Sequence, residues 1–156
     1  MSVGLPPFQR LLDAYAEDVY GFLHATVGAT EADDCFQDTF LAALRAYPRL
    51  QRGDNLRSWL LTIAHRKAID AHRARGRRAV PVAEVPERPA KPPRDVDPEL
   101  WSAVRVLPPK QRAAVAHRFV NDLPYRDIAV VMSCSEDAAR QSVRAGLATL
   151  RERGLR

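Results

Sequence analysis

The stretch that decides the fold is DDCFQDTFLAALRAYPRLQRGDNLRSWLLTIAHRKAIDAHRARGRR, residues 33–78, which starts acidic and ends strongly basic. Residues 65–78 carry six Lys or Arg against one acid, whereas residues 1–64 carry five bases against eight acids. Lys and Arg on a helix suit a polyanion, because they displace the counterions of its phosphates. The acidic surface must then serve another partner. The basic run can also be read as a solvated helix face.

Apolar spacing around this stretch predicts three helices in the first 78 residues. The first is expected to end at Gly28, Thr30 is expected to cap the second, and the third is expected to begin near Leu56, after a loop. The predicted buried stripe of the first helix consists of Phe8, Leu12, Tyr15, Val19 and Phe22. That of the second consists of Phe36, Phe40, Leu44 and Tyr47. Trp59 is interpreted as a core residue of the third helix rather than a platform for base stacking.

Prolines mark a boundary in the middle of the chain. Residues 79–98 contain six of the twelve prolines, and proline disfavours helix both at its own position and at the residue before it. The sequence therefore predicts two small domains, 1–78 and 98–156, joined by a Pro-rich linker, 79–97, that is long enough to let them move apart.

The second half is also predicted to be helical. Asp97 and Pro98 are expected to start a helix that ends at Pro108 and Pro109, where another begins. Two further helices, YRDIAVVM and the segment after Ser135, are separated by a tight turn, with Ser135 as the N-cap of the last. The last helix is predicted to bury Ala139, Val143, Leu147 and Leu150 and to direct Glu136, Arg140, Gln141 and Arg144 outward. Such a helix-turn-helix places its second helix in the major groove, although any αα corner has a similar apolar pattern.

Composition limits the other classes of function. The net charge is +5 over 156 residues, which favours a polyanionic partner. No apolar run approaches the ~20 residues of a membrane span, and the first residues lack a signal peptide, so a cytoplasmic protein without membrane insertion is expected. Cys35 and Cys134 are interpreted as ordinary reduced thiols. The histidines His24, His65, His72 and His117 form no constellation and are expected at surface or boundary positions.

Taken together, DDCFQDTFLAALRAY, LRSWLLTIAHRKAIDAHRARGRR, the Pro-rich linker and LPPKQRAAVAHRFVNDLPYRDIAVVMSCSEDAARQSVRAGLATLRER resemble a bacterial RNA polymerase sigma factor of the extracytoplasmic function group. The resemblance covers nearly the whole chain in order and spacing. It implies an all-α fold made of a region 2 helical bundle and a region 4 helix-turn-helix. The implied function is to bind core polymerase, to recognise the −35 and −10 promoter elements and to help melt the DNA.

The resemblance also implies which residues do this. Docking on the β′ clamp helices of the polymerase falls to Asp34, Gln37, Asp38 and Leu41. Contacts with the −10 element fall to Arg52, Asp54, Asn55, Arg66, Lys67 and Arg73, with Asn55 as the base reader. Contacts with the −35 element fall to Arg126, Ser135, Arg140, Gln141 and Arg144. The chain departs from the family pattern at Arg66, where Asn is commoner, and at Ser142, Ala145 and Gly146, where relatives often place longer polar residues.

The implied partners are core polymerase, through its β′ and β subunits, promoter DNA and an anti-sigma factor. No catalytic residue, metal, cofactor or small-molecule substrate is expected, because the sequence shows no nucleophile pattern, nucleotide loop or metal-ligand spacing. Two alternatives remain at this stage. One is a promoter-binding regulator that never joins polymerase, and the other is a sigma-like protein that only sequesters another factor.

Overall fold

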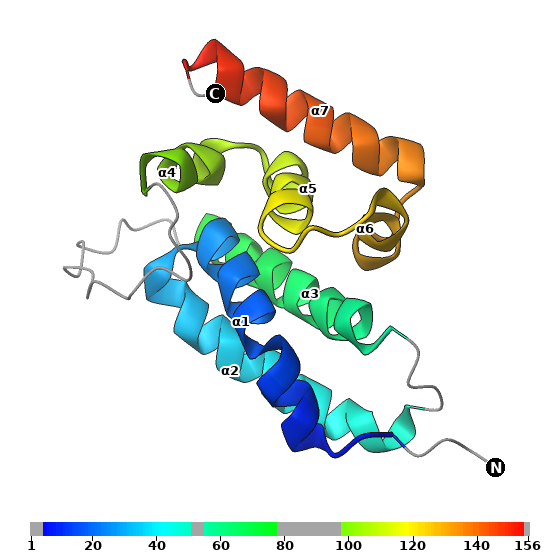
Figure 1. The fold of residues 1–156 in the computed structure, drawn as a ribbon. Coiled ribbons are helices and arrows are strands. Elements are labelled where there is room, and N and C mark those ends of the chain that lie inside the picture. The colour runs from blue at the N-terminus through cyan, green and yellow to red at the C-terminus, as the bar shows by residue number, and fades with distance from the viewer. Residues whose placement is uncertain (1–4, 51–54, 78–97, 155–156) are drawn as a thin grey trace.

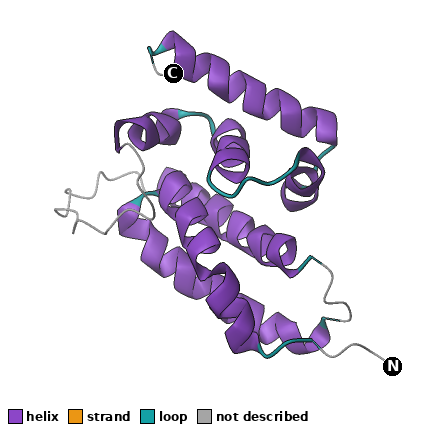
Figure 2. Ribbon diagram, in the orientation of Figure 1, coloured by secondary structure: helices purple, strands orange, loops and turns teal. Residues whose placement is uncertain are grey.

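The computed structural model describes residues 5–50, 55–77 and 98–154, and every regular element in these ranges is a helix (Figure 2). The helices form two bundles that follow one another along the chain (Figure 1). The all-α prediction is therefore confirmed. The expected linker, 79–97, lies outside the described residues, and so does the predicted cap Asp97.

The N-terminal bundle consists of α1 (Phe8–Val27), α2 (Ala29–Ala46), the short 3-10 helix η1 (Tyr47–Arg49) and α3 (Leu56–Arg77). Its core contains the fully buried Val19, Phe22 and Leu60, with the rings of Phe40 and Tyr47 also buried. The predicted apolar stripe of α1 is confirmed as the side of the helix that faces the core, since its members are buried or pack against this core. The prediction for α2 is wrong at one position, Leu44, whose side chain is half exposed.

The junction of α1 and α2 is tighter than the sequence suggested. Gly28 ends α1 with a φ of 88°, and its carbonyl oxygen already accepts a hydrogen bond from the Ala32 backbone (3.0 Å). The helix α2 therefore begins at Ala29, one residue before Thr30, and no side chain caps it. The predicted Thr30 cap is wrong because the glycine turns the chain without needing a separate capping residue.

The C-terminal bundle consists of α4 (Pro98–Val106), α5 (Pro109–Phe119), α6 (Tyr125–Met132) and α7 (Glu136–Glu152). The predicted break at Pro108 and Pro109 is confirmed, as are the bounds of α6. Ser133 lies in the left-handed region (φ 54°) and closes α6 before the turn into α7. A small core of Val104, Leu107, Val115 and Leu150 holds α4, α5 and α7 together.

The two bundles lie against each other. Helix α3 packs on α6 and α5, and α1 packs on α4 and α5, while α7 lies on the side away from the N-terminal bundle (Figure 1). Buried side chains of both bundles belong to one continuous cluster, which includes Phe22 and Leu60 together with Ala116 and Ile128. The linker was expected to let the two parts move apart, but in this structure they share a core.

Two arginines of the C-terminal bundle lie at the C-terminal end of α1. Arg112 Nη1 donates a hydrogen bond to the Thr26 carbonyl oxygen (3.0 Å), and its Nη2 donates to the Leu107 carbonyl (3.0 Å). Arg105 lies so close to Gly28 that a Cβ there would meet its Nη1 at 2.9 Å. Cations are favoured at this position because carbonyl groups at a helix C-terminus point outward with partial negative charge.

Candidate nucleic-acid and partner surfaces

The outer side of α2 carries an exposed acidic face. Asp34, Gln37 and Asp38 are exposed, and Leu41 is 51% and Leu44 50% exposed. Their spacing of three and four residues places them along one side of the helix. We call these five residues the acidic face. Two large leucines one turn apart in water, with carboxylates beside them, are typical of a surface that docks on a partner protein.

Cys35 lies on the inner side of α2, beneath the acidic face. It is buried, and burial first, then the charges of Glu31, Asp38 and Asp34, raises the pKa of its thiol to about 11. A thiol with such a pKa stays protonated at neutral pH and is a poor nucleophile. Cys134 is exposed in the turn between α6 and α7. Both cysteines are free, as the sequence predicted.

The distal half of α3 carries the basic face. Arg66 and Arg73 are exposed and Lys67 is half-buried, while Ala64 and Ala68 on the other side pack into the core. We call Arg66, Lys67 and Arg73 the basic face. Arg75, which follows the basic face on α3, forms a 2.8 Å ion pair with Glu31 of α2, so this half of α3 lies beside α2. The bundle therefore presents opposite charges from two adjacent helices.

Asn55 forms the start of α3. It lies in the left-handed region (φ 54°), which Asn tolerates better than most residues, and its Oδ1 accepts a hydrogen bond from the Ser58 backbone (3.3 Å). Its Nδ2 donates to Asp127 Oδ1 of the C-terminal bundle (3.3 Å). The predicted base reader thus also caps a helix and holds a contact between the bundles. Arg52 and Asp54, predicted beside it, lie outside the described residues.

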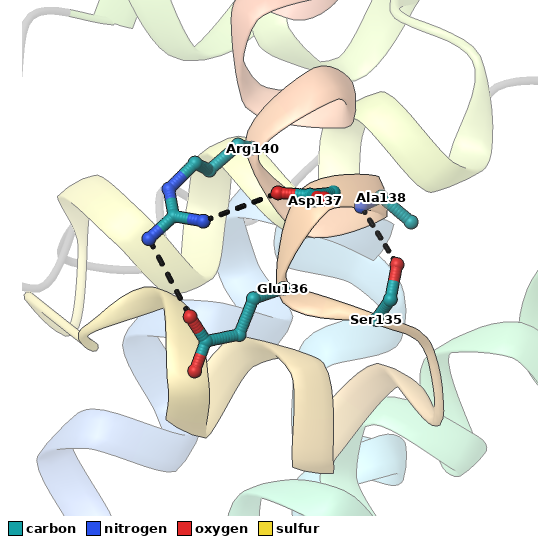
Figure 3. Close-up of polar contacts among 5 residues, drawn as sticks. All are labelled: Ser135, Glu136, Asp137, Ala138 and Arg140. Carbon is teal, nitrogen blue, oxygen red and sulfur yellow. Dashed lines mark hydrogen bonds and ion pairs between the residues drawn. The ribbon is translucent and has the colours of Figure 1, made fainter.

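The turn between α6 and α7 is built as the sequence predicted. Ser135 Oγ accepts a hydrogen bond from the Ala138 backbone (3.0 Å), so it is the N-cap of α7 (Figure 3). Arg140 bends back over the first turn, where its guanidinium reaches Glu136 Oε2 and Asp137 Oδ1, each at 3.4 Å (Figure 3). The predicted reader Arg140 is therefore already paired with two carboxylates of its own helix.

The remaining predicted reader residues lie on the surface. Arg126 on α6 and Gln141 and Arg144 on α7 are all exposed. The Arg140 guanidinium carbon also lies 5.1 Å from the centre of the Tyr125 ring, which links the starts of α6 and α7. Gln141 and Arg144 point outward from the same helix, because Ala139 and Val143 take the buried side.

Gly146 belongs to the core and not to the outer face of α7. It is buried, and a Cβ at this position would lie 2.7 Å from Val115 Cγ2 on α5. The resemblance to the family had suggested that a long polar side chain is missing at this position. Because Gly146 faces α5, a larger residue would require Val115 and α5 to shift away from α7. Ala145, by contrast, is exposed, and Ser142 is half-buried.

Comparisons with known proteins agree with this geometry. The family description "Sigma-70 region 2" matches residues 11–78, and "Sigma-70, region 4" matches residues 98–150. The RNA polymerase sigma factor CarQ of Myxococcus xanthus is 31% identical, over 93% of this chain and 87% of CarQ. The ECF RNA polymerase sigma factor SigD of Mycobacterium tuberculosis is 32% identical, over 92% of this chain and 75% of SigD.

The chain belongs to the extracytoplasmic function group of RNA polymerase sigma factors. Its fold is that of the sigma factor RpoE of Bartonella quintana, whose structure in complex with the anti-sigma factor NepR matches with a TM-score of 0.78 over 93% of this chain and 94% of RpoE, at 24% identity. The N-terminal bundle of this sigma factor is region 2 and the C-terminal bundle is region 4. Sigma factors bind core RNA polymerase and direct initiation at promoters.

Region 4 covers the start of α3 in region 2. Besides the Asn55 contact, the Arg57 guanidinium donates to the Asn121 carbonyl of region 4 and to Asp18 Oδ2 on α1 (2.9 Å). The side chains of Ser58 and Asn121 are buried at this boundary, and the Ser58 hydroxyl and the Asn121 amide have no hydrogen-bond partner among the described residues. The boundary is therefore partly polar and incompletely satisfied.

Two histidines also meet across the boundary, where the sequence had suggested surface or boundary positions. His65 on α3 and His117 on α5 are buried, and His65 Nδ1 lies 3.1 Å from His117 Nε2. The expectation of surface or boundary positions is wrong for these two histidines, because both are buried. Each histidine lies on the apolar side of its helix, and the buried Leu61 and Ala68 are one turn away from His65 on either side. This helical spacing in the sequence could have predicted that the histidines are buried.

Within residues 5–50, 55–77 and 98–154, no group of three or more His, Cys, Asp or Glu side chains could hold a metal ion. The same ranges contain no helix that is long and apolar enough to cross a membrane.

Proposed function

We propose that the acidic face of α2 docks this sigma factor on the β′ clamp helices of core polymerase. The observation that carries the proposal is the placement of opposite charges on two adjacent helices of region 2. The acidic face cannot bind DNA phosphates, and its two exposed leucines, Leu41 and Leu44, add apolar area at its C-terminal end. Charge complementarity would set the speed and specificity of docking, and the leucines would contribute affinity.

We propose that the start of α3 and its basic face bind the −10 element. Arg66, Lys67 and Arg73 would hold the DNA backbone while the amide of Asn55 reads an unstacked base. Arg52 and Asp54 complete this proposed surface from the neighbouring loop. Because Asn55 contacts Asp127, reading requires region 4 to move away from α3.

We propose that α7 reads the −35 element with Gln141 and Arg144 in the major groove and that region 4 approaches the β subunit. Arg126 and Ser135, both at the surface of the helix pair, would contact phosphates. Arg140 would have to leave Glu136 and Asp137 to reach DNA. Its share of the binding energy should therefore be smaller than that of Arg144.

We further propose that the protein is a non-catalytic subunit that works in the bacterial cytoplasm, where core polymerase transcribes. The functional units are residues 1–78 and 98–156, joined by the linker 79–97. An anti-sigma factor is the proposed regulator. This is supported by the similarity in fold to RpoE, which was solved with the anti-sigma factor NepR.

Transcription in vitro tests the proposed function directly. Purified core polymerase and this chain are mixed with a genomic DNA library, and the 5′ ends of the transcripts are sequenced. Start sites that share two elements at a fixed spacing are the expected result. If no site depends on the chain, the sigma activity proposed for this protein is wrong. Capture of core polymerase by the chain separates a sigma factor from a regulator that binds promoters alone.

A further inference from the structure

The most unusual feature of the boundary between regions 2 and 4 is the pair of buried histidines. His65 Nδ1 and His117 Nε2 are 3.1 Å apart, so one ring donates its proton to the lone pair of the other. Phe22 of region 2 stacks on the His117 ring, with 4.1 Å between ring centres and an interplanar angle of 10°. His117 is thus enclosed by two region 2 side chains, and separation of the regions would expose it to water.

Among the described residues, no carboxylate forms an ion pair with either ring. The charged residues on the four helices around the pair are Arg10, Asp13, Glu17 and Asp18 on α1, Arg57, Arg66, Lys67, Asp70, Arg73, Arg75 and Arg77 on α3, Lys110, Arg112 and Arg118 on α5, and Arg126 and Asp127 on α6. Of these, Asp18 pairs with Arg57, and Asp127 accepts a hydrogen bond from Asn55. Arg112 and Arg118 donate to backbone carbonyls. His117 Nδ1 is buried and has no hydrogen-bond partner among the described residues, so an added proton there would be unsolvated.

We infer that the His65–His117 pair is an acid-sensitive latch between regions 2 and 4. While both rings are neutral, their hydrogen bond holds the regions together. A proton on either ring places an uncompensated charge in the shared core, and the regions separate so that the charge reaches water. Opening also releases Asn55 from Asp127. On the proposed function of Asn55, this release exposes the residue that reads the −10 element.

The direction of the pH effect follows from the environment of the rings. Burial, then the charge of Arg66, lowers the pKa of His65 to about 4, and burial, then His65, lowers the pKa of His117 well below its ordinary value. In the open form both pKa values return to about 6.5. The open form then binds more protons below that pH, so the closed form is favoured at neutral pH and weakens as the pH falls from about 6.5. Each ring contributes about tenfold at pH 5.5, and the pair about 100-fold.

The distance between the regions tests the latch in the full chain. One dye is placed on the exposed native Cys134 of region 4 and a second on Ala14→Cys, an exposed position of α1. Energy transfer and helix content by circular dichroism are followed from pH 8 to pH 5. We expect transfer to fall below pH 6.5 while helix content stays constant. Constant transfer, or a loss of helix in parallel with it, would overturn the inference.

Substitution of the two histidines tests whether they cause the pH-dependent change in energy transfer. The double variant His65→Gln with His117→Gln keeps hydrogen-bonding groups but cannot titrate, so its transfer should not change with pH. His72→Gln on the exposed side of α3 is the matched control and should behave like the wild type. The latch is refuted if the double variant and the wild type show the same pH profile.

Histidine ring resonances in the wild-type protein give a measurement that does not depend on how the variants fold. The two buried rings should take up protons only along with the fall in energy transfer. Titration of both rings near pH 6.5 with unchanged transfer would contradict the latch. None of these readouts uses polymerase or DNA, so a failure of the latch is distinct from a failure of the sigma activity, which transcription at pH 7.5 tests.

Discussion

Asn55 Nδ2 in region 2 donates a hydrogen bond to Asp127 Oδ1 in region 4, across 3.3 Å. The residue proposed to read the −10 element is therefore occupied by a carboxylate of the region proposed to read the −35 element. On the proposed roles, Asp127 and an unstacked base compete for the same amide of Asn55, so binding of the −10 strand would have to displace Asp127.

Removal of the Asp127 carboxylate should strengthen binding of a single-stranded −10 probe by the free sigma factor. A hydrogen bond of this kind contributes about 0.5–1.5 kcal/mol, so Asp127→Ala is expected to raise affinity by about 2- to 10-fold, measured by fluorescence anisotropy. Glu152→Ala, at the exposed end of α7, removes the same charge far from α3 and is the control. Equal effects of the two variants would show that net charge alone is responsible.

Charge reversal on the acidic face should weaken core binding. Asp38→Lys is expected to lower the affinity for core polymerase by about tenfold at low salt, with less effect at high salt, because charges at an interface are screened. Surface plasmon resonance with immobilised core polymerase measures the affinity at low and at high salt. Asp13→Lys on the exposed side of α1 is the matched control. Unchanged affinity of the Asp38 variant would place the docking surface elsewhere.

Leu44→Ala separates the docking surface from the core. Because Leu44 is half exposed, its truncation should change the free energy of unfolding by less than about 0.5 kcal/mol, yet weaken core binding. Urea denaturation and the core-binding assay measure the two effects. The buried stripe first assigned to Leu44 predicts the opposite, a large loss of stability without a specific binding defect.

Arg140 and Arg144 of α7 should contribute unequally to promoter binding. Arg140 has to give up two carboxylates before it reaches DNA, whereas Arg144 is exposed. Arg144→Ala should therefore weaken binding of a −35 duplex more than Arg140→Ala. Because a contact in the major groove reads base edges, its loss should cost about 1–3 kcal/mol on the cognate duplex and less on an unrelated one. Binding titrations with cognate and unrelated duplexes give both quantities. A larger effect at Arg140 would mean that DNA displaces its carboxylates at little cost.

Gly146→Ala should destabilise region 4, although helix propensity alone favours alanine by about 1 kcal/mol. The added Cβ would lie 2.7 Å from Val115 Cγ2, and overpacking of this kind costs about 1–3 kcal/mol. Urea denaturation of the full chain measures the difference. The matched variant Ala145→Gly, at the exposed neighbouring position, should lose only the propensity term. A more stable Gly146→Ala protein would show that α5 and α7 can separate without penalty.

Local signals predicted much of this fold, while contacts between distant segments had to come from the structure. The cap Ser135 and the bounds of α6 were predictable because a cap and an apolar repeat act within a few residues. Leu44 was misassigned because a spacing of four from Phe40 fits the helix repeat, whereas the core follows Ala43 and Tyr47.

The exposure of the candidate surface residues was predicted better than the boundary between the regions. Asp34, Gln37, Asp38, Arg66, Arg73, Gln141 and Arg144 are exposed, as polar residues opposite an apolar stripe should be. The contact between His65 and His117 joins residues 52 positions apart, and no local pattern encodes their meeting. Their partners, and the contact between Asn55 and Asp127, depend on how two bundles pack.

Gly28 limits which residues can join the first two helices of this protein. Its φ of 88° and ψ of 166° lie in a region that essentially only glycine adopts, and a Cβ there would also meet Arg105 Nη1 at 2.9 Å. The end of a long arginine side chain can move aside, so the backbone conformation is the stronger constraint. Any other residue at this position is expected to change the direction in which α2 leaves α1, and with it the orientation of the acidic face relative to region 4.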